Sequence, residues 1–185
     1  MIMSLRIAAV SLFVVLLFAG GAFGQDAPKN DQKKPLKEQI TIAEETFKLE
    51  VAADDKTRAK GLMGRKNLDE HGGMIFIYKR AKLQSFWMKN CLIDIDLMYL
   101  DSRGRIVSMH QMKKEPPRGQ HETMFDYDRR LKRYPSGRSS QFIIELKPGS
   151  IDRLKLKVDQ TIELDLPKLR QIVVRQERAE REGRN

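Results

Sequence analysis

The feature that most constrains the fold is a series of short apolar or alternating segments, closely spaced and separated by turn residues. Residues 46–52 alternate polar with apolar side chains, which is the period of a half-buried strand. Residues 95–100 and 105–109 flank an Asp-Ser-Arg-Gly turn, which indicates a hairpin. We therefore expect a mainly β fold, a compact antiparallel barrel or sandwich with short inserted helices.

The individual elements follow from the same patterns. Strands are expected at 46–52, 74–78, 84–88, 95–100, 105–109, 141–146 and 161–166. Helices are expected at 57–63, 122–133 and 150–156. The first helix follows Asp54 and Asp55, because a carboxylate there can cap free backbone N–H groups, and Gly64 suits its left-handed end.

The start of the chain has the order of a cleavable secretory signal, residues 1–24. Arg6 gives a positive start, residues 7–18 are almost wholly apolar, and Ala22 and Gly24 are the small residues that a signal peptidase requires. The apolar run is shorter than the roughly 20 residues that span a bilayer. We expect an extracytoplasmic protein, periplasmic or secreted, with N-terminal membrane anchoring as the alternative.

The remainder divides by composition into three parts. Residues 25–39 are polar and are expected to be a flexible leader. Residues 40–166 are expected to form the β domain, within which 113–138 is a highly charged surface insertion. Residues 167–185 are expected to form a helical tail, because their apolar residues fall on one helical face before a charged end.

The net charge of the chain indicates which classes of partner it can bind. The 185 residues carry a formal net charge of +10, which favours an anionic small molecule, an acidic glycan or a membrane surface. Acidic residues are interspersed among the basic ones, and export argues against a genomic role. We therefore expect no nucleic-acid partner.

Three segments carry a resemblance to a known family. They are Arg-Ala-Lys-Gly-Leu-Met-Gly-Arg at 58–65, Gly-Met-Ile-Phe at 73–76, and Phe-Trp-Met-Lys-Asn at 86–90. Over residues 47–164 the chain resembles the uncharacterised bacterial and archaeal family called DUF192 or UPF0127. Cys91 stands where that family usually has Thr. The resemblance implies a mainly β fold, often behind a signal peptide, and no established activity.

The same segments contain the candidate binding residues. On an extended segment Trp87 and Lys89 share one side, and an aromatic platform beside an ammonium suits a sugar ring that carries a carboxylate. The alternative is that Trp87 covers the core and Lys89 pairs with Asp94 or Asp96. Arg58 could bind a carboxylate or phosphate through its guanidinium fork, as could Arg65. The two arginines could equally tie the helix to the sheet through Asp96 or Glu145.

The candidate site therefore comprises Arg58, Arg65, Trp87, Lys89, Asn90 and Asp96. We expect an exported module that binds an anionic small molecule or glycan at the cell envelope. One alternative is a hydrolase-type enzyme that uses Asp96 with Lys89 or Arg58. Another is an electrostatic membrane-surface or structural protein.

No motif assigns a catalytic residue, a metal or a cofactor. The three histidines lack the close spacing of metal ligands, and there is no P-loop, Gly-x-Ser-x-Gly elbow or dinucleotide fingerprint. Cys91 is the only cysteine, so no intramolecular disulfide can form. Its apolar surroundings in the sequence predict a buried, inert thiol.

Overall fold

The structure is a computed structural model that describes residues 35–182. The expected secretory segment, residues 1–24, lies outside the described residues, as do 25–34 of the expected leader and 183–185 of the expected tail. Within the part of the chain that the structure describes, no helix is long and apolar enough to cross a bilayer.

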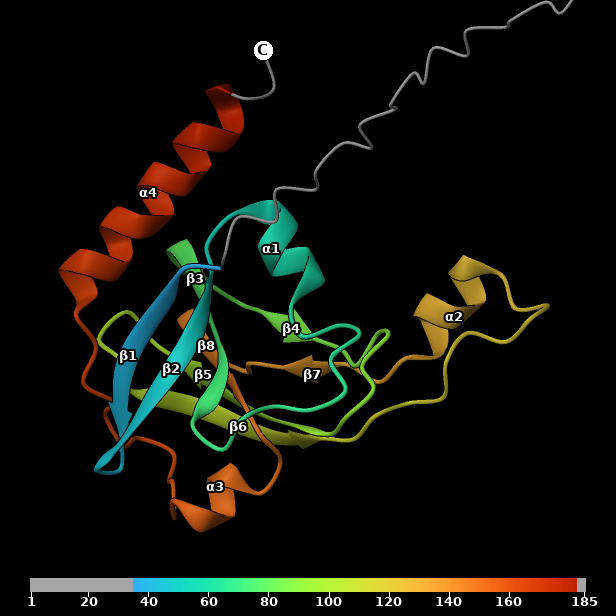
Figure 1. The fold of residues 1–185 in the computed structure, drawn as a ribbon, viewed down its shortest axis with the longest axis horizontal. Coiled ribbons are helices and arrows are strands. Elements are labelled where there is room, and N and C mark those ends of the chain that lie inside the picture. Colours follow the sequence, from blue (N-terminus) through green and yellow to red (C-terminus); the bar gives the residue numbers. More distant parts are fainter. Residues whose placement is uncertain (1–34, 183–185) are drawn as a thin grey trace, which may run out of the picture. The chain divides into compact units, whose positions relative to one another are not determined.

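The described residues form eight strands and four helices (Figure 1). The strands are β1 (Lys37–Ile42), β2 (Glu45–Ala52), β3 (Gly72–Lys82), β4 (Ser85–Phe86), β5 (Ile95–Leu100), β6 (Ile106–Met112), β7 (Tyr134–Pro135) and β8 (Ser140–Leu146). The helices are α1 (Asp55–Lys60), α2 (Met124–Arg130), α3 (Ser150–Arg153) and α4 (Leu166–Glu182). The prediction of a mainly β fold with short helices and a C-terminal helix is confirmed.

The strands form one mixed sheet of six, in the order β1-β2-β3-β8-β5-β6, and a separate pair, β4-β7. β1 and β6 are open edges, so the six strands do not close into a barrel. The expectation of purely antiparallel pairing is wrong at β2 and β3, which run parallel. A parallel pair needs a long crossover connection, and α1 with the loop after it supplies one.

Several element boundaries differ from the predictions. The sheet begins at Lys37, before the expected start near residue 40, since Ile40 and Ile42 alternate inward on β1. The first helix ends at Lys60 and not near residue 63, because Gly61 already leaves the helical conformation with φ 47°. The strand expected at 161–166 is a single bridge at Thr161.

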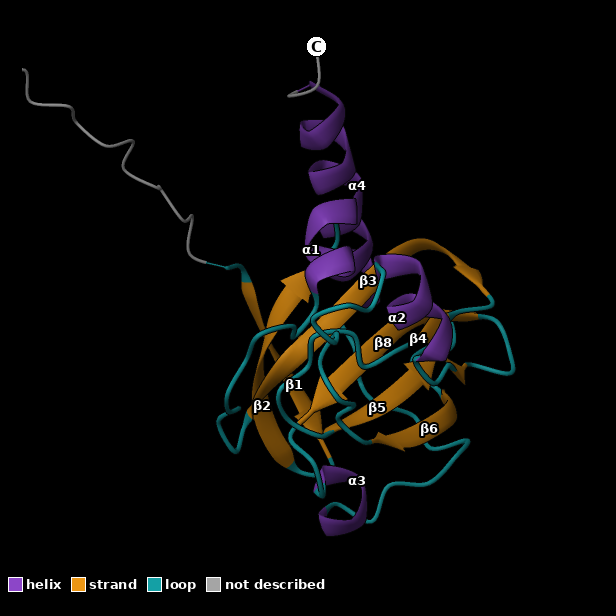
Figure 2. Cartoon of the chain, turned by 90° about the vertical axis from the view of Figure 1, so that its right-hand side faces the viewer, coloured by secondary structure: helices purple, strands orange, loops and turns teal. Residues whose placement is uncertain are grey.

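The sheet carries apolar residues on both faces. On the central strand β8, Phe142, Ile144 and Leu146 face the cluster that Leu169 and Val173 of α4 help to bury. Ile143 faces the opposite cluster, under α1 and β4. In Figure 1, α4 lies on one side of the sheet and α1, α2 and β4 lie on the other, and Figure 2 views this second side.

The charged region 113–138 is only partly a surface insertion. α2 is held by the buried side chains of Tyr127 and Leu131, and β7 contributes buried Tyr134. The expectation that this region contributes nothing to the core is therefore wrong at these positions. The lysine and arginine side chains of the region remain exposed, as expected.

Candidate functional site

A carboxylic acid lies in the middle of the sheet. Glu145 is on β8, opposite Met74 of β3 and Leu97 of β5, and 5 % of the residue is exposed. By the alternation of β8 it shares the face of Ile143, under α1. Its Oε2 atom is buried and has no hydrogen-bond partner among the described residues. Buried polar groups are nearly always hydrogen-bonded, so this one requires an explanation.

Close backbone approach at Glu145 depends on a glycine, and a second glycine lies near its carboxyl group. A Cβ on Gly73 of β3 would lie 2.3 Å from the carbonyl oxygen of Glu145, so only glycine lets the two strands meet there. A Cβ on Gly61 would lie 3.9 Å from the Oε2 atom of Glu145. The end of α1 therefore lies directly over the carboxyl group.

Burial sets the protonation of this group. Desolvation raises the pKa of Glu145 from 4.5 to about 8, because an apolar environment disfavours the carboxylate. The acid is therefore mostly neutral at pH 7. It can then donate one hydrogen bond from its hydroxyl group and accept others.

Glu145 lines a pocket of about 200 Å³. The pocket lies between the end of α1, strands β3 and β4, and the loop after β4. Its lining includes Arg58, Lys60, Tyr78, Trp87, Lys89 and Cys91. Phe86 stands edge-on to Phe76, with ring centroids 4.9 Å apart, and these two rings form an aromatic wall.

Cys91 is buried, as the sequence predicts. Desolvation, with a smaller effect of nearby Glu145, raises the pKa of the Cys91 thiol to about 12. Since the thiolate is the reactive form, this cysteine is inert at neutral pH. It contributes shape to the pocket wall.

Arg58 ties three elements together. Its guanidinium donates to the carbonyl oxygens of Ala53 at 2.7 Å and Ile77 at 3.0 Å. It also pairs with Asp55 at 2.7 Å and with Glu177 of α4 at 3.8 Å. These partners replace Asp96 and Glu145, through which we expected the tie. Arg58 lines the pocket, but its fork is already engaged.

Lys89 and Trp87 both line the pocket. The ammonium of Lys89 is 5.0 Å from the indole centroid, and the guanidinium of Arg133 is 3.8 Å from it. Lys89 also pairs with Asp128 at 2.6 Å, in place of the expected Asp94 or Asp96. Asn90 lies beside them, and its backbone N–H donates to the Tyr127 hydroxyl at 3.0 Å. Asn90 therefore holds α2 against the loop.

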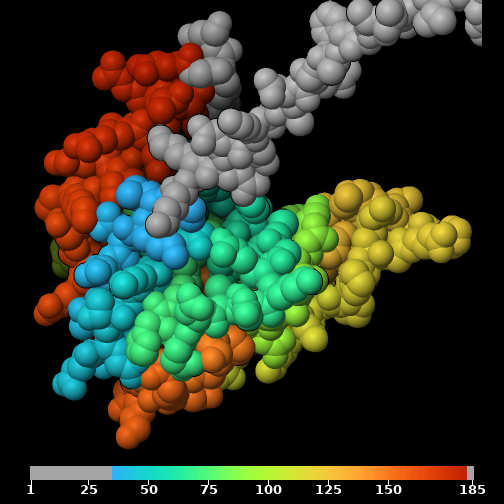
Figure 3. Space-filling model, viewed as in Figure 1, coloured from blue at the N-terminus to red at the C-terminus, as the bar shows by residue number. Residues whose placement is uncertain are grey.

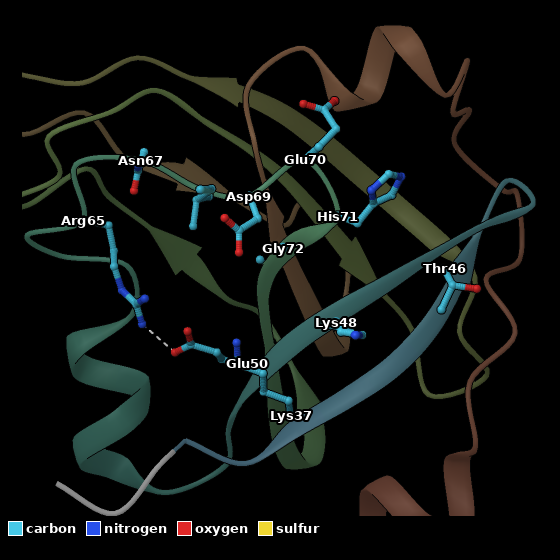
Figure 4. A pocket seen from close by; sticks show the side chains of 12 residues that line it. Lys37, Thr46, Lys48, Glu50, Arg65, Asn67, Asp69, Glu70, His71 and Gly72 are labelled. Atoms are coloured by element: carbon cyan, nitrogen blue, oxygen red, sulfur yellow. Dashed lines mark hydrogen bonds and ion pairs between the residues drawn. The ribbon is translucent and has the colours of Figure 1, made fainter.

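Arg65 lies in a different, larger hollow of about 520 Å³ (Figure 4). There it pairs with Glu50 at 2.5 Å. Lys37 and Lys48 lie on one side of the hollow, and Asp69 and Glu70 lie on the other. The smaller pocket is the better candidate despite its size, because it contains the buried Glu145 atom without a partner. Half of the residues that line the larger hollow are charged, and Arg65 and Glu50 among them already pair with each other.

Asp96 lies away from both hollows. On β5 it has the same orientation as Met98 and Leu100, which face the α4 side, whereas Tyr99 faces the side of Glu145. Its Oδ2 atom accepts from the N–H of Ile151 at 2.7 Å, at the start of α3. The structure therefore does not bring Asp96 to Lys89 or Arg58, and its role is to hold α3 to the sheet.

Of the six predicted residues, Arg58, Trp87 and Lys89 line one pocket, with Asn90 beside it. The central residue, Glu145, was considered only as a structural partner. The available signal was a single acid within Phe-Ile-Ile-Glu-Leu at 142–146, where a fully buried strand would tolerate no charge without a reason.

Within residues 35–182, no three His, Cys, Asp or Glu side chains are grouped to hold a metal ion.

The comparisons with known proteins agree with the resemblance read from the sequence. The model of DUF192, described as uncharacterized ACR, matches residues 38–164. The chain belongs to the DUF192 family. No curated protein matches it.

Two solved structures share the DUF192 fold of this chain. A protein of Sinorhizobium meliloti 1021, described as a "putative transcription regulator", is 23% identical, with a TM-score of 0.57 over 70% of this chain and 94% of its own. A protein of unknown function from Novosphingobium aromaticivorans DSM 12444 is 24% identical, with a TM-score of 0.54 over 70% and 84%. At these identities the likeness concerns the fold alone.

Proposed function

We propose that this chain is an exported binding module that takes a small ring-shaped anion, of the acidic monosaccharide class, in the pocket over Glu145. The observation that carries the proposal is the buried Oε2 atom of Glu145, which has no partner in the described chain and lines the pocket. A ligand hydroxyl would supply the missing hydrogen bond. The volume of about 200 Å³ suits one sugar-sized ring and is below the roughly 300–1,000 Å³ of larger ligand sites.

The charge at the pocket supports an anion. Lys60 is exposed at the rim, and a protonated Glu145 adds no negative charge. Lys89 lies deeper, where Asp128 already neutralises it. The Phe86 ring offers apolar surface to a face of a sugar ring, whereas Arg133 and Lys89 lie over the Trp87 ring. Export rests on the secretory pattern of residues 1–24. A hydrolase that pairs Asp96 with Lys89 or Arg58 is not proposed, since Asp96 faces the other side of the sheet.

Calorimetric titration tests this with glucuronate, galacturonate and N-acetylneuraminate against neutral glucose. We expect the acidic sugars to bind more tightly than glucose at pH 7. Glu145→Leu should weaken binding at least tenfold, because an apolar side chain cannot make the hydrogen bond. Lys60→Gln should weaken the binding of the acidic sugars about twofold to fivefold, because an exposed ion pair contributes about 0.2–1 kcal/mol.

Arg65→Gln is the matched control, since Arg65 lies in the other hollow, and it should leave binding unchanged. Raising the pH from 7 to 9.5 should weaken anion binding as Glu145 ionises, and Glu145→Gln should remove this dependence. If no acidic sugar binds, or if Glu145→Leu binds as well as the natural chain, the proposal is wrong.

A further inference from the structure

The connection between β6 and β7 projects from the body of the described domain. In Figures 1 and 3 it forms an arm, coloured yellow, with α2 lying within it. Its base is fixed to the pocket wall, where Asp128 pairs with Lys89 and the Tyr127 hydroxyl contacts Asn90. An arm held rigidly at its base can present its outer surface to a partner.

Two large apolar side chains of α2 are exposed to solvent. Tyr127 is buried, and Leu131 just after the helix is 3 % exposed, so these two anchor the arm. Met124 is 53 % exposed and Phe125 is 72 % exposed, among the largest exposures of big apolar side chains in residues 35–182. Arg129 lies over the Phe125 ring at 5.6 Å. An exposed aromatic beside a cation is typical of surfaces that enter the headgroup region of a bilayer.

The arm carries more basic than acidic side chains. The connection, residues 113–133, contains seven basic and four acidic side chains, a net charge of +3. Each acid has a partner within the domain. Glu122 pairs with Arg130 at 2.6 Å, Asp128 pairs with Lys89, and Glu115 accepts from the N–H of Lys132 at 2.9 Å.

Asp126, the fourth acid, accepts from the Thr123 hydroxyl at 2.7 Å and lies 3.4 Å from Arg129. The basic side chains of the arm are all exposed, although Lys113 also pairs with Asp94 at 3.0 Å, and Arg129 and Arg130 pair with two of these acids. The others are Lys114, Arg118, Lys132 and Arg133. The field outside the arm is therefore positive.

We propose that this arm docks on an anionic phospholipid bilayer, with Phe125 and Met124 entering the interface and the surrounding cations contacting lipid phosphates. Charge complementarity selects an anionic partner, and the exposed apolar pair selects a bilayer over a soluble polyanion. A polyanion would be attracted by the cations but would leave Phe125 in water. This surface is separate from the pocket over Glu145 and does not depend on the ligand proposed for it.

Vesicle co-sedimentation of the full chain tests the proposal, with phosphatidylcholine vesicles that contain or lack 30% phosphatidylglycerol. Phe125→Ser should weaken binding to the anionic vesicles at least tenfold, because the Phe ring that leaves water on entering the interface is lost. Arg129→Gln and Lys132→Gln should each weaken it about fivefold, and 1 M salt should weaken it further.

Leu83→Ser is the matched control for Phe125→Ser. Leu83 is 69 % exposed but lies outside the arm, so its loss should leave binding unchanged. Any vesicle binding by the apolar residues 7–18 is the same in all variants. Equal losses for Phe125→Ser and Leu83→Ser would overturn the proposal. Binding that falls with salt but ignores Phe125 would indicate a polyanion-type contact and would overturn it too.

A probe at the tip gives a second readout. Met124→Cys can be labelled with the environment-sensitive dye NBD, because Cys91 is buried and unreactive. We expect a blue shift on anionic vesicles, and none for a label at Lys155→Cys, which lies after α3. A label at 124 that stays in water while the protein sediments with vesicles would show that the tip does not insert.

Discussion

At the scale of single residues, Glu145 is the unusual feature of the domain. A carboxyl group at the centre of a sheet costs stability, since ionisation there requires removing the charge from water. The protein keeps it as a neutral acid, with its pKa raised to about 8 by burial. Asp96 is the contrasting case, because its carboxyl group accepts a backbone hydrogen bond at the start of α3. One acid holds the structure together and the other lines a pocket.

Glu145 predicts a pH dependence of stability. Its pKa is about 8 in the folded chain and near 4.5 when unfolded, so the folded state holds the proton more tightly. The contribution of this group is fully present below pH 4.5 and is lost as the pH rises to about 8. The free energy of unfolding should fall by a few kcal/mol across that window, at about 1.4 kcal/mol for each pKa unit.

Urea unfolding at pH 5, 7 and 9 measures this effect as a difference between the natural chain and Glu145→Gln. The amide is neutral throughout, so the variant should gain stability relative to the natural chain as the pH rises. A constant difference between the two proteins from pH 5 to 9 would contradict the assignment.

At the scale of elements, local chemistry explains where the helices form and tertiary contacts explain which of them matter. Asp54 caps α1 by accepting from the N–H of Thr57 at 2.7 Å, as its position in the sequence suggests. α4 contributes Leu169 and Val173 to the core, and both are fully enclosed by the sheet. The charged end of α4 has no such apolar contact, so its first half carries the packing energy.

A matched pair of substitutions on α4 tests whether its buried side chains carry the packing energy. Leu169 is 2 % exposed and Val174 is 51 % exposed. Leu169→Ala should lower the free energy of unfolding by about 2–5 kcal/mol, as expected for a cavity in a core. Val174→Ala should change it by about 0.5 kcal/mol or less. Chemical denaturation measures both, and similar values for the two variants would mean that α4 does not pack as described.

At the scale of the whole described domain, two apolar clusters share one sheet. β3, β5 and β8 contribute side chains to both faces, since their residues alternate between the clusters. The packing of each face therefore depends on strands that also carry the packing of the other face. The pocket and the arm both lie on the α1 side, so ligand binding and surface docking would use the same face.

This shared sheet predicts a single unfolding transition. Trp87, the only tryptophan, reports on the pocket side, whereas far-UV circular dichroism reports on the sheet and α4. The two probes should give the same urea midpoint, because the clusters unfold together. Separated midpoints would show that the pocket side melts independently.

Strand pairing was hardest to predict from the sequence where the two strands are far apart along the chain. The hairpin of β5 and β6 was predictable, because one short turn joins the two strands. The parallel pair β2-β3 and the central place of β8 were not, since each depends on contacts between distant segments. The same limit applies to the site. Trp87 and Lys89 are near in sequence and were found together, whereas Glu145 reaches them only through strand order.

The sequence by itself determined the family, the mainly β character, the short helices and the aromatic-basic segment at 86–90. These follow from local periodicity, capping residues and an unbroken motif. Only the tertiary structure decided that Asp96 and Glu145 face opposite sides of the sheet, because strand order and alternation place each side chain. It also decided which charges are neutralised, since ion pairs such as Lys89 with Asp128 join residues 39 positions apart.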